Sequence, residues 1–349
     1  MFDADKIFMR RALELARRGA GLTSPNPMVG AVLVNESRVV GEGYHRYDSV
    51  KHAETHALEA ARESARGATL YVNLEPCCHQ GRTPPCTDAL INAGIARAVV
   101  AIKDPNKRVA GRGIEQLREA GIEVDVGLLE DEALRLNESY IKFVGTGLPF
   151  VHGVIEYSAN SLARNSDWRP SNEFLRLVSE YDALILGGRA ELNRLVADAA
   201  VGRERHRQLV VAVSNEEHEL LRSLRKRIAS KSSTVRFDAR PAAEAAGNVV
   251  SLIGGAPRGV ERSQLRSLLT TLGRMNVTSV VVLPGSLDLG DSSNFEELDK
   301  ATLVIPGNEQ RFAAPWVYGD IEFDLDDVSV TAAHGCSELT GYPSLRGVA

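Results

Sequence analysis

The sequence predicts an α/β protein of two domains, and three observations lead to this prediction. The chain of 349 residues is longer than a typical single domain of roughly 100–200 residues. Apolar runs typical of strands alternate with helical patterns along the chain, which favours helices layered on a largely parallel sheet. A glycine-rich stretch at residues 145–149 interrupts this alternation, so we expect domains over residues 1–146 and 147–349.

Each element of the first domain follows from a local pattern. Helices are expected where alanine and other apolar residues recur at helical spacing. They cover residues 5–18, 52–66, 86–93 and 114–120. Strands are expected in short, β-branched runs bounded by turn residues. They cover residues 29–35, 38–43, 69–74, 98–102 and 122–126.

The same patterns continue in the second domain. Its expected strands cover residues 151–157, 183–186, 209–213, 249–253, 277–283, 302–305 and 321–330. Its expected helices cover residues 172–180, 190–199 and 262–275. The last twenty residues are mostly small and polar, so we expect a loosely held tail there.

The composition is that of an ordinary globular protein. Hydrophobic residues make up 44% of the chain and charged residues 25%, with a net charge of -5. This balance gives no electrostatic reason to expect a nucleic-acid partner. The first residues lack the pattern of a secretory signal, and no apolar run reaches the roughly 18 residues of a membrane helix. We therefore expect a cytoplasmic protein with no membrane association.

Three of the four cysteines are clustered. Cys77, Cys78 and Cys86 lie within ten positions, whereas Cys336 stands alone near the C-terminus. A disulfide scaffold would spread its cysteines along the chain. A cluster in a cytosolic protein instead favours metal ligands or redox groups.

Three short motifs together predict a catalytic zinc site: His52-Ala53-Glu54, Pro76-Cys77 and Pro85-Cys86. Catalytic zinc uses three protein ligands and keeps a further position for water. His52, Cys77 and Cys86 supply such a set. Glu54 is then the proton carrier between water, the ring and the departing amine. This combination is the signature of zinc deaminases, so we predict Glu54 as the catalytic residue.

Other metal sites are compatible with parts of this pattern. A purely structural zinc site would need a fourth protein ligand, which His56 or His79 could supply. A metalloprotease pair of His52 and His56 would need a glutamate directly after the first histidine, and here the glutamate stands one position later. Cys78 competes with Cys77 for the ligand role, which we assign to Cys77 because it follows the proline turn.

Longer motifs extend beyond the metal site. They are Ser24-Pro25-Asn26-Pro27-Met28-Val29-Gly30, Gly43-Tyr44-His45, Leu74-Glu75-Pro76-Cys77, His79-Gln80-Gly81-Arg82-Thr83-Pro84-Pro85-Cys86, Asp104-Pro105-Asn106 and Gly111-Arg112-Gly113. With these motifs, residues 5–145 resemble the deaminase domain of the bacterial bifunctional riboflavin-biosynthesis deaminase/reductase family. The step from Cys77 to Cys86 separates this family from the tRNA adenosine and cytidine deaminases, which use a shorter Cys-x-x-Cys.

The resemblance implies a fold, a substrate and a set of site residues. The fold is a cytidine-deaminase-like, three-layer α/β/α domain with a mixed sheet, followed by a dihydrofolate-reductase-like α/β domain that uses NADPH. The substrate is a diaminopyrimidinone carrying a ribosylamino 5′-phosphate, which loses one ring amine as ammonia. Beyond the zinc ligands, the implied substrate-binding residues are Asn26, His45, His79, Arg82, Asp104 and Asn106.

Three of these assignments have plain structural alternatives. Arg82 suits a phosphate, because arginine forms charge-assisted bonds with it, and the plain alternative is a solvated loop charge. Asp104 and Asn106 either bind substrate or only shape a turn before Gly111. Lys107 stands where the family usually shows proline.

The second half keeps few traces of the reductase. Family segments are altered at residues 151–160, 187–191 and 284–286, where the reductase has a lysine-containing strand, a Gly-x-x-Thr-Val segment and a Glu-Gly-Gly turn. The glycine pair at residues 254–255 is more simply a turn than a phosphate site. These losses argue against NADPH binding, so we predict a degenerate reductase fold kept for stability or subunit contact.

Our main hypothesis is a riboflavin-pathway deaminase with one zinc ion per chain and an inactive second domain, which we expect to form a homodimer. One alternative is the full bifunctional enzyme with altered NADPH contacts. Another is a deaminase recruited to a related pyrimidine or purine. A third is a non-catalytic, zinc-stabilised scaffold, against which Glu54 argues because a structural site needs no carboxylate beside it.

Overall fold

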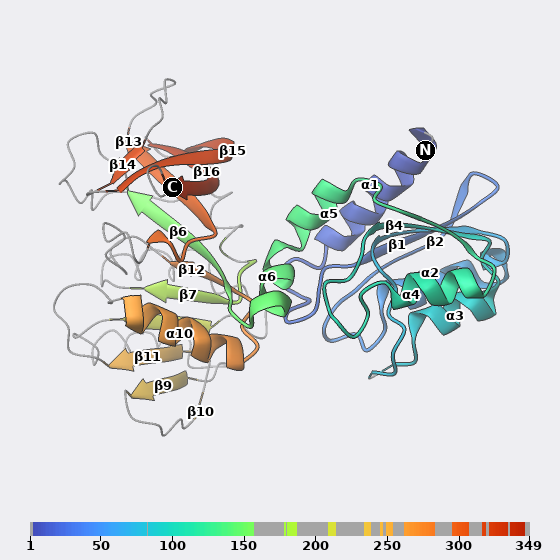
Figure 1. Ribbon diagram of the computed structural model, residues 1–349, viewed down its shortest axis with the longest axis horizontal. Coiled ribbons are helices and arrows are strands. Elements are labelled where there is room, and N and C mark those ends of the chain that lie inside the picture. Colours follow the sequence, from blue (N-terminus) through green and yellow to red (C-terminus); the bar gives the residue numbers. More distant parts are fainter. Residues whose placement is uncertain are drawn as a thin grey trace. The chain divides into compact units, whose positions relative to one another are not determined.

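The computed structural model places the described residues in two compact units, Met1–Gly147 and Leu148–Ala349 (Figure 1). Each unit has its own sheet and its own hydrophobic core. The described residues are 3–81, 83–156, 178, 180–186, 209–213, 234–238, 245–246, 249–253, 262–282, 295–306, 316–318, 321–333 and 336–345.

The sheet of the first unit is mixed, with the strand order β2-β1-β3-β4-β5. Its strands are β1 Gly30–Asn35, β2 Arg38–Tyr44, β3 Thr69–Leu74, β4 Arg97–Ile102 and β5 Glu123–Val126. β1 pairs antiparallel with β2 and β3, whereas β3, β4 and β5 run parallel. The expectation of a largely parallel sheet is therefore wrong for this unit, because β1 and β2 form a hairpin that adds to β3 in the opposite sense. The mixed sheet implied by the family resemblance is confirmed.

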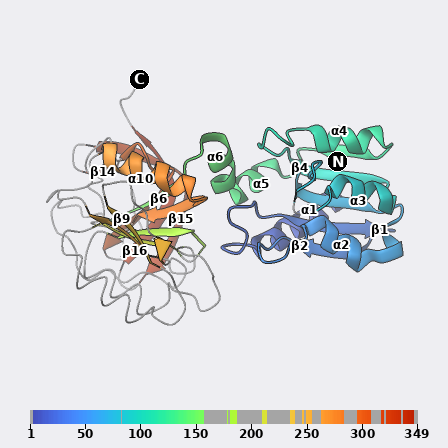
Figure 2. The ribbon, with the colours of Figure 1, turned by 90° about the horizontal axis from the view of Figure 1, so that it is seen from below.

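Helices cover both faces of this sheet (Figures 1 and 2). They are α1 Asp3–Arg17, α2 Ala53–Ala61, α3 Cys86–Ala93, α4 Arg112–Glu119, α5 Glu130–Leu136 and α6 Glu138–Thr146. Because strand side chains alternate between faces, Leu33 and Val100 pack with α2, α3 and α4, whereas Val32 and Val99 pack with α1 and α5. This is the predicted three-layer α/β/α fold. Sequence patterns missed α5 and α6.

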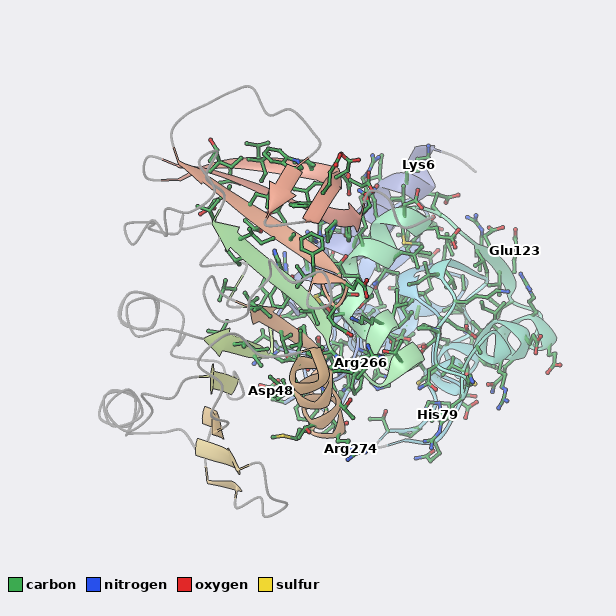
Figure 3. All side chains as sticks on the ribbon, turned by 60° about the vertical axis from the view of Figure 1, so that its left-hand side comes forward. Lys6, Asp48, His79, Glu123, Arg266 and Arg274 are labelled. Atoms are coloured by element: carbon green, nitrogen blue, oxygen red, sulfur yellow. The ribbon has the colours of Figure 1, made fainter. Side chains whose placement is uncertain are left out.

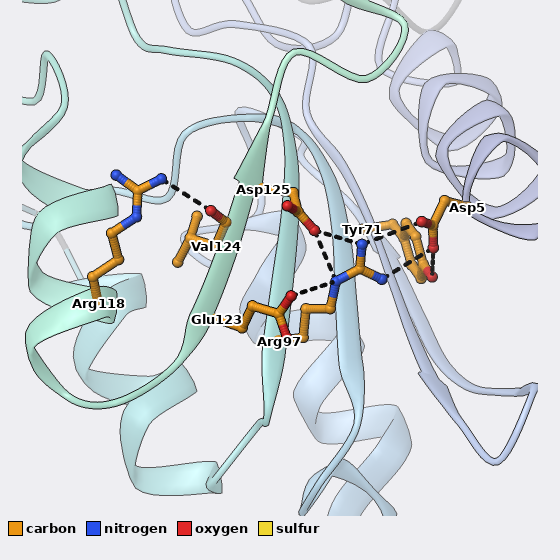
Figure 4. A network of polar contacts seen from close by, with 7 residues as sticks. All are labelled: Asp5, Tyr71, Arg97, Arg118, Glu123, Val124 and Asp125. Atoms are coloured by element: carbon orange, nitrogen blue, oxygen red, sulfur yellow. Dashed lines mark hydrogen bonds and ion pairs between the residues drawn. The ribbon is translucent and has the colours of Figure 1, made fainter. Parts of the chain in front are cut away.

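A partly buried ion-pair network ties α1 to the sheet where β4 begins (Figure 4). Asp5 is buried, and its Oδ1 accepts hydrogen bonds from the Tyr71 hydroxyl at 2.6 Å and from Arg97 Nη1 at 3.1 Å. Arg97 Nε also donates to Asp125 Oδ2 at 2.9 Å. Residues of α1, β3, β4 and β5 are thereby held together.

The second unit has an extended mixed sheet, with the order β10-β9-β11-β8-β7-β12-β6-β13-β16-β15-β14. Its strands are β6 Phe150–Glu156, β7 Ala183–Leu186, β8 Leu209–Val213, β9 Thr234–Asp238, β10 Ala245–Ala246, β11 Val249–Ile253, β12 Ser279–Val282, β13 Lys300–Pro306, β14 Trp316–Tyr318, β15 Ile321–Ala333 and β16 Cys336–Leu345. The central strands from β9 to β13 are parallel, and α10, Arg262–Arg274, packs against them through Leu265, Leu269 and Leu272.

The expectation of a loosely held C-terminal tail is wrong for the described residues, which end at Leu345. β15 extends to Ala333, and β16 lies between β13 and β15 with antiparallel pairing on both sides. Leu339 is buried in the core, and backbone pairing on two edges holds a segment whose other side chains are mostly small or polar. Sequence patterns also missed β9, β10 and β14. The helix expected at 190–199 and nearly all of the one at 172–180 lie outside the described residues.

A polar group sits in the core of the second unit. His152 of β6 is fully buried, with Nδ1 at 2.9 Å from the Tyr181 hydroxyl and Nε2 at 2.8 Å from Thr302 Oγ1. Burial, followed by the charge of Lys300, lowers the pKa of His152 to about 3. The imidazole is therefore neutral at physiological pH.

Among the helices of the described residues, none has the length and apolar character that a membrane span needs.

Candidate metal centre

Three elements of the first unit bring His52, Cys77 and Cys86 together. His52 is the extended residue that precedes α2, Cys77 follows β3 after Pro76, and Cys86 is the first residue of α3. His52 Nδ1 lies 3.2 Å from Cys86 Sγ and 3.4 Å from Cys77 Sγ. All three possible ligand atoms lie within 4.8 Å of one another. The convergence expected from the sequence is therefore present.

The chemistry of these donors fits a zinc ion. A hydrogen bond from Cys86, supported by His52, lowers the pKa of Cys77 and so favours its thiolate form. The pKa of Cys86 is raised because it hydrogen-bonds Cys77 and is buried. Two sulfurs and one imidazole nitrogen at this spacing are a donor set that zinc prefers.

A structural zinc site with a fourth ligand is not what the described residues form. The ligand group contains only three residues, and neither histidine considered as a fourth ligand belongs to it. His56 Nε2 instead lies 2.9 Å from Ser49 Oγ. The exposed His79 lies on the loop between Cys77 and Cys86 (Figure 3).

Glu54 stands beside the ligands in the first turn of α2. Its side chain is only 3% exposed, and burial, followed by the nearby Cys77, raises its pKa to about 7. Close packing of α2 on β2 fixes this position. A Cβ atom on Gly43 would lie 2.3 Å from the Ala53 carbonyl oxygen, so only glycine permits the contact. Glu54 is thus a buried carboxyl group that can exchange protons next to the metal site.

Asn26 and His45 form a pair on the same side of the unit. Asn26 Nδ2 lies 3.1 Å from His45 Nε2, while His45 Nδ1 lies 3.3 Å from the Lys51 carbonyl oxygen. A carbonyl can only accept, so Nδ1 carries the proton and Nε2 accepts from the Asn26 amide. The His45 and His52 rings are 5.4 Å apart. The side-chain oxygen of Asn26, Oδ1, is thereby left to accept a hydrogen bond from a ligand.

Asp104 and Asn106 form a tight turn after β4. Asp104 Oδ1 accepts hydrogen bonds from the Asn106 backbone N–H at 2.8 Å and from the Tyr140 hydroxyl at 3.1 Å. Asn106 Oδ1 accepts from the Arg108 backbone N–H at 3.0 Å. The turn-shaping role is therefore present, and a substrate role for these residues stays a prediction. Arg82, the predicted phosphate ligand, lies outside the described residues.

Sequence reasoning missed the most extensively bonded side chain of the site. Glu75 is buried at the end of β3, and its carboxylate accepts four backbone N–H groups, from Asp104 at 3.1 Å, Gly111 at 2.9 Å, Gly113 at 2.9 Å and Ile114 at 3.3 Å. It therefore holds the 104–114 segment against the turn that leads to Cys77. The Leu74-Glu75-Pro76-Cys77 motif contained this residue but did not show what it binds.

Two buried amides that were also missed fix the loop that carries Asn26. Asn73 Nδ2 donates to the Met28 carbonyl at 2.9 Å, and its Oδ1 accepts from the Gly30 N–H at 2.8 Å. Asn137 Oδ1 accepts from the Met28 N–H at 2.9 Å. Isolated asparagines carry no periodic signal, so no sequence pattern could identify these contacts.

Comparison with known proteins agrees with the site. Residues 3–102 match the family described as the cytidine and deoxycytidylate deaminase zinc-binding region. Over 147 residues the chain is 54% identical to the riboflavin biosynthesis protein RibD of Escherichia coli, an alignment that covers 42% of this chain and 40% of that protein. The chloroplastic riboflavin biosynthesis protein PYRD of Zea mays is 39% identical over 283 residues, which cover 80% of this chain and 70% of that one.

A solved structure is similar over nearly the whole chain. It is a diaminohydroxyphosphoribosylaminopyrimidine deaminase/5-amino-6-(5-phosphoribosylamino)uracil reductase from Thermotoga maritima, with a TM-score of 0.74 and 27% identity. The comparison covers 98% of this chain and 99% of that chain. Both predicted fold classes, deaminase-like and reductase-like, are confirmed by this match.

Proposed function

The chain belongs to the family of the riboflavin biosynthesis proteins RibD and PYRD, and from that premise we propose that its first unit is a zinc-dependent aminopyrimidine deaminase. The substrate we propose is 2,5-diamino-6-ribosylamino-4(3H)-pyrimidinone 5′-phosphate, in which the C–N bond to one exocyclic amino group is replaced by a C=O bond. Water is consumed and ammonia is released. The observation that carries this proposal is the convergence of His52, Cys77 and Cys86 beside the buried Glu54.

The residues around the metal site have different roles in the proposed reaction. His52, Cys77 and Cys86 would hold a zinc ion, which would supply the Lewis acidity that makes water nucleophilic near neutral pH. Glu54 accepts a proton from the attacking water and returns it first to the ring nitrogen and then to the departing amine. The Asn26 carbonyl oxygen accepts a hydrogen bond from the pyrimidine, and His45 holds the Asn26 amide in that orientation.

We assign the phosphate and the ribose of the substrate to two different loops. We assign the phosphate to His79 and Arg82 because cationic and N–H donors favour phosphate oxygens. Asp104 and Asn106 are assigned to the ribose, whose hydroxyls suit a carboxylate and an amide. The exposure of His79 supports an outer, solvent-facing position for the phosphate.

For the second unit we propose a reductase-like fold without NADPH-dependent activity. The departures at residues 151–156 support this, because the strand has no lysine and its His152 is enclosed by Tyr181 and Thr302 in the core. The segments at 187–191 and 284–286 lie outside the described residues. A homodimer through this unit is also proposed, and the exposed Val328 and Val330 of β15 support it. The expected cytoplasmic location stays a prediction.

Product analysis tests the proposal. The purified chain is incubated with the diaminopyrimidinone phosphate, with and without NADPH, and the products are identified. We expect ammonia and the deaminated pyrimidine in both reactions, with no oxidation of NADPH. NADPH-dependent reduction of the product would establish the bifunctional alternative. One zinc ion per chain with no ammonia from any aminopyrimidine phosphate would establish the scaffold, and turnover of another ring only would establish a recruited deaminase.

A further inference from the structure

The start of α6 lies against two loops that are distant in sequence. Asn137, the residue before α6, contacts Met28 through its side-chain amide, and Tyr140 in the first turn of α6 contacts Asp104. These loops carry the proposed pyrimidine ligand Asn26 and the proposed ribose ligands Asp104 and Asn106. A single helical turn therefore supports both sides of the proposed substrate site.

Asn137 serves the Asn26 loop and not its own helix. It occupies the cap position of α6, where asparagine usually bonds the first helical N–H groups, yet its side chain makes no cap bond. Its Oδ1 instead accepts from the Met28 N–H at 2.9 Å, and its Nδ2 donates to the Met28 carbonyl at 3.0 Å. Only Pro27 separates Met28 from Asn26, so this pair of bonds limits the movement of the Asn26 backbone.

Tyr140 orients the Asp104 carboxylate. Its hydroxyl and the Asn106 N–H both donate to Asp104 Oδ1, at 3.1 and 2.8 Å. Within the described part of the chain, no further donor reaches the Asp104 carboxylate. Both of these donors thus converge on Oδ1, which leaves Oδ2 for a ligand hydroxyl in the proposed site.

We propose that the start of α6 belongs to the substrate-binding machinery, with Asn137 and Tyr140 as positioning residues for the loops of Asn26 and Asp104. The inference rests on the proposed deaminase function and deepens it. Because both residues act on substrate contacts and not on the metal, their loss weakens binding more than it slows the chemical step.

The chain offers a matched control for Tyr140. The Tyr71 hydroxyl also donates to a buried aspartate, Asp5, at 2.6 Å, but this pair lies where β4 begins, whereas Asp104 follows the end of β4. Tyr140→Phe and Tyr71→Phe each remove one hydroxyl from one such pair. For Tyr140→Phe we expect KM to rise about two- to tenfold, the effect of one ordinary hydrogen bond, with kcat changed less than twofold. Tyr71→Phe leaves KM unchanged, and both variants keep their zinc.

A second pair of variants tests Asn137. Asn137→Ala removes both bonds to Met28 and is expected to raise KM in the same way. Asn35→Ala is its control, because Asn35 also makes two hydrogen bonds to the backbone, from Nδ2 to the carbonyl oxygens of Ser64 and Arg66, but on the exposed surface. An unchanged KM in both Tyr140→Phe and Asn137→Ala overturns the inference. So does an equal rise in KM in Tyr71→Phe, which would indicate general loosening of the unit.

Hydrogen exchange separates this inference from the proposed function. We expect Tyr140→Phe to speed amide exchange at Asn106 and Val109, and Asn137→Ala to speed it at Met28, without an effect of either control. Unaltered exchange overturns the inference whatever the chain does to the substrate. If the unaltered chain and Tyr71→Phe both release no ammonia, the proposed function fails, and accelerated exchange would still support the anchoring of the two loops.

Discussion

Replacing Glu75 by glutamine is expected to loosen the first unit, although the change alters only one atom. Oε2 accepts from the N–H groups of Asp104 and Gly111, and Oε1 accepts from those of Gly113 and Ile114. In the Glu75→Gln variant an NH₂ group must face one of these two pairs of donors. Two hydrogen bonds are lost, and two largely buried N–H groups are left without an acceptor.

The size of the effect follows from those two groups. Each buried donor left unsatisfied costs about 1–3 kcal/mol, so the variant should lose about 2–6 kcal/mol of stability. That is a large part of the roughly 5–15 kcal/mol that stabilises an ordinary domain. Both tryptophans, Trp168 and Trp316, belong to the second unit, so their fluorescence would not report this change. Native-state hydrogen exchange of the β3 and β4 amides reports the opening of the first unit directly.

Glu59→Gln is the matched control for this measurement. Glu59 is exposed and pairs with Lys51 on the surface, so the same chemical change there should cost less than about 1 kcal/mol. Equal exchange rates at the β3 and β4 amides in Glu75→Gln and Glu59→Gln would refute the argument that Glu75 holds the 104–114 segment.

Three further predictions concern the metal, a close contact and the second unit. Metal analysis should show that Cys86→Ser loses zinc, with local unfolding, whereas Cys78→Ser keeps it. Zinc loss in Cys78→Ser instead would mean that the ligand is misassigned. In Gly113→Ala the new Cβ would lie 2.2 Å from the Pro76 carbonyl oxygen, so hydrogen exchange should show about 1–3 kcal/mol of destabilisation. Gly145→Ala in α6 is the control, because its new Cβ meets no atom within 4 Å and the change should be neutral or stabilising. Equal stability changes in the two variants would contradict the close contact of Gly113 with Pro76. His152 has a pKa of about 3 when folded and about 6.5 when unfolded, so its neutral form stabilises the unit above pH 6.5, and stability is lost as pH falls toward 3. Urea unfolding followed by tryptophan fluorescence should show that the free energy of unfolding falls by about 2 kcal/mol more in the unaltered protein than in His152→Gln between pH 6.5 and 5. The same pH dependence in both proteins would refute this.

The sequence was informative where a pattern is local. The motifs around His52, Cys77 and Cys86 predicted the three-residue convergence, because each ligand sits at the end of an element whose bounds could be predicted from the residues beside it. The short apolar run at residues 69–74 and the helical spacing at residues 86–93 likewise placed β3 and α3 correctly. The reach of Glu75 to four backbone groups, and of Asn137 to Met28, depends on how distant segments fold together, and neither residue type signals it.

Polarity misled the prediction for the C-terminus. The stretch around Ser337–Thr340 contains few large apolar side chains, yet β16 is held by pairing with β13 and β15, which its composition does not reveal. The helices α5 and α6 were missed because they follow one another with only Asn137 between them, and no glycine or proline separates the two, although Gly147 caps the end of α6.

Ammonia release by Glu54→Gln tests the central claim most directly. The substitution keeps the size of the side chain and all three metal ligands, but it removes the group that carries protons. We predict one zinc ion per chain, as in the unaltered protein, and ammonia release from the diaminopyrimidinone phosphate that is lower by about two to four orders of magnitude. Near-normal release by a zinc-loaded Glu54→Gln protein would contradict the account.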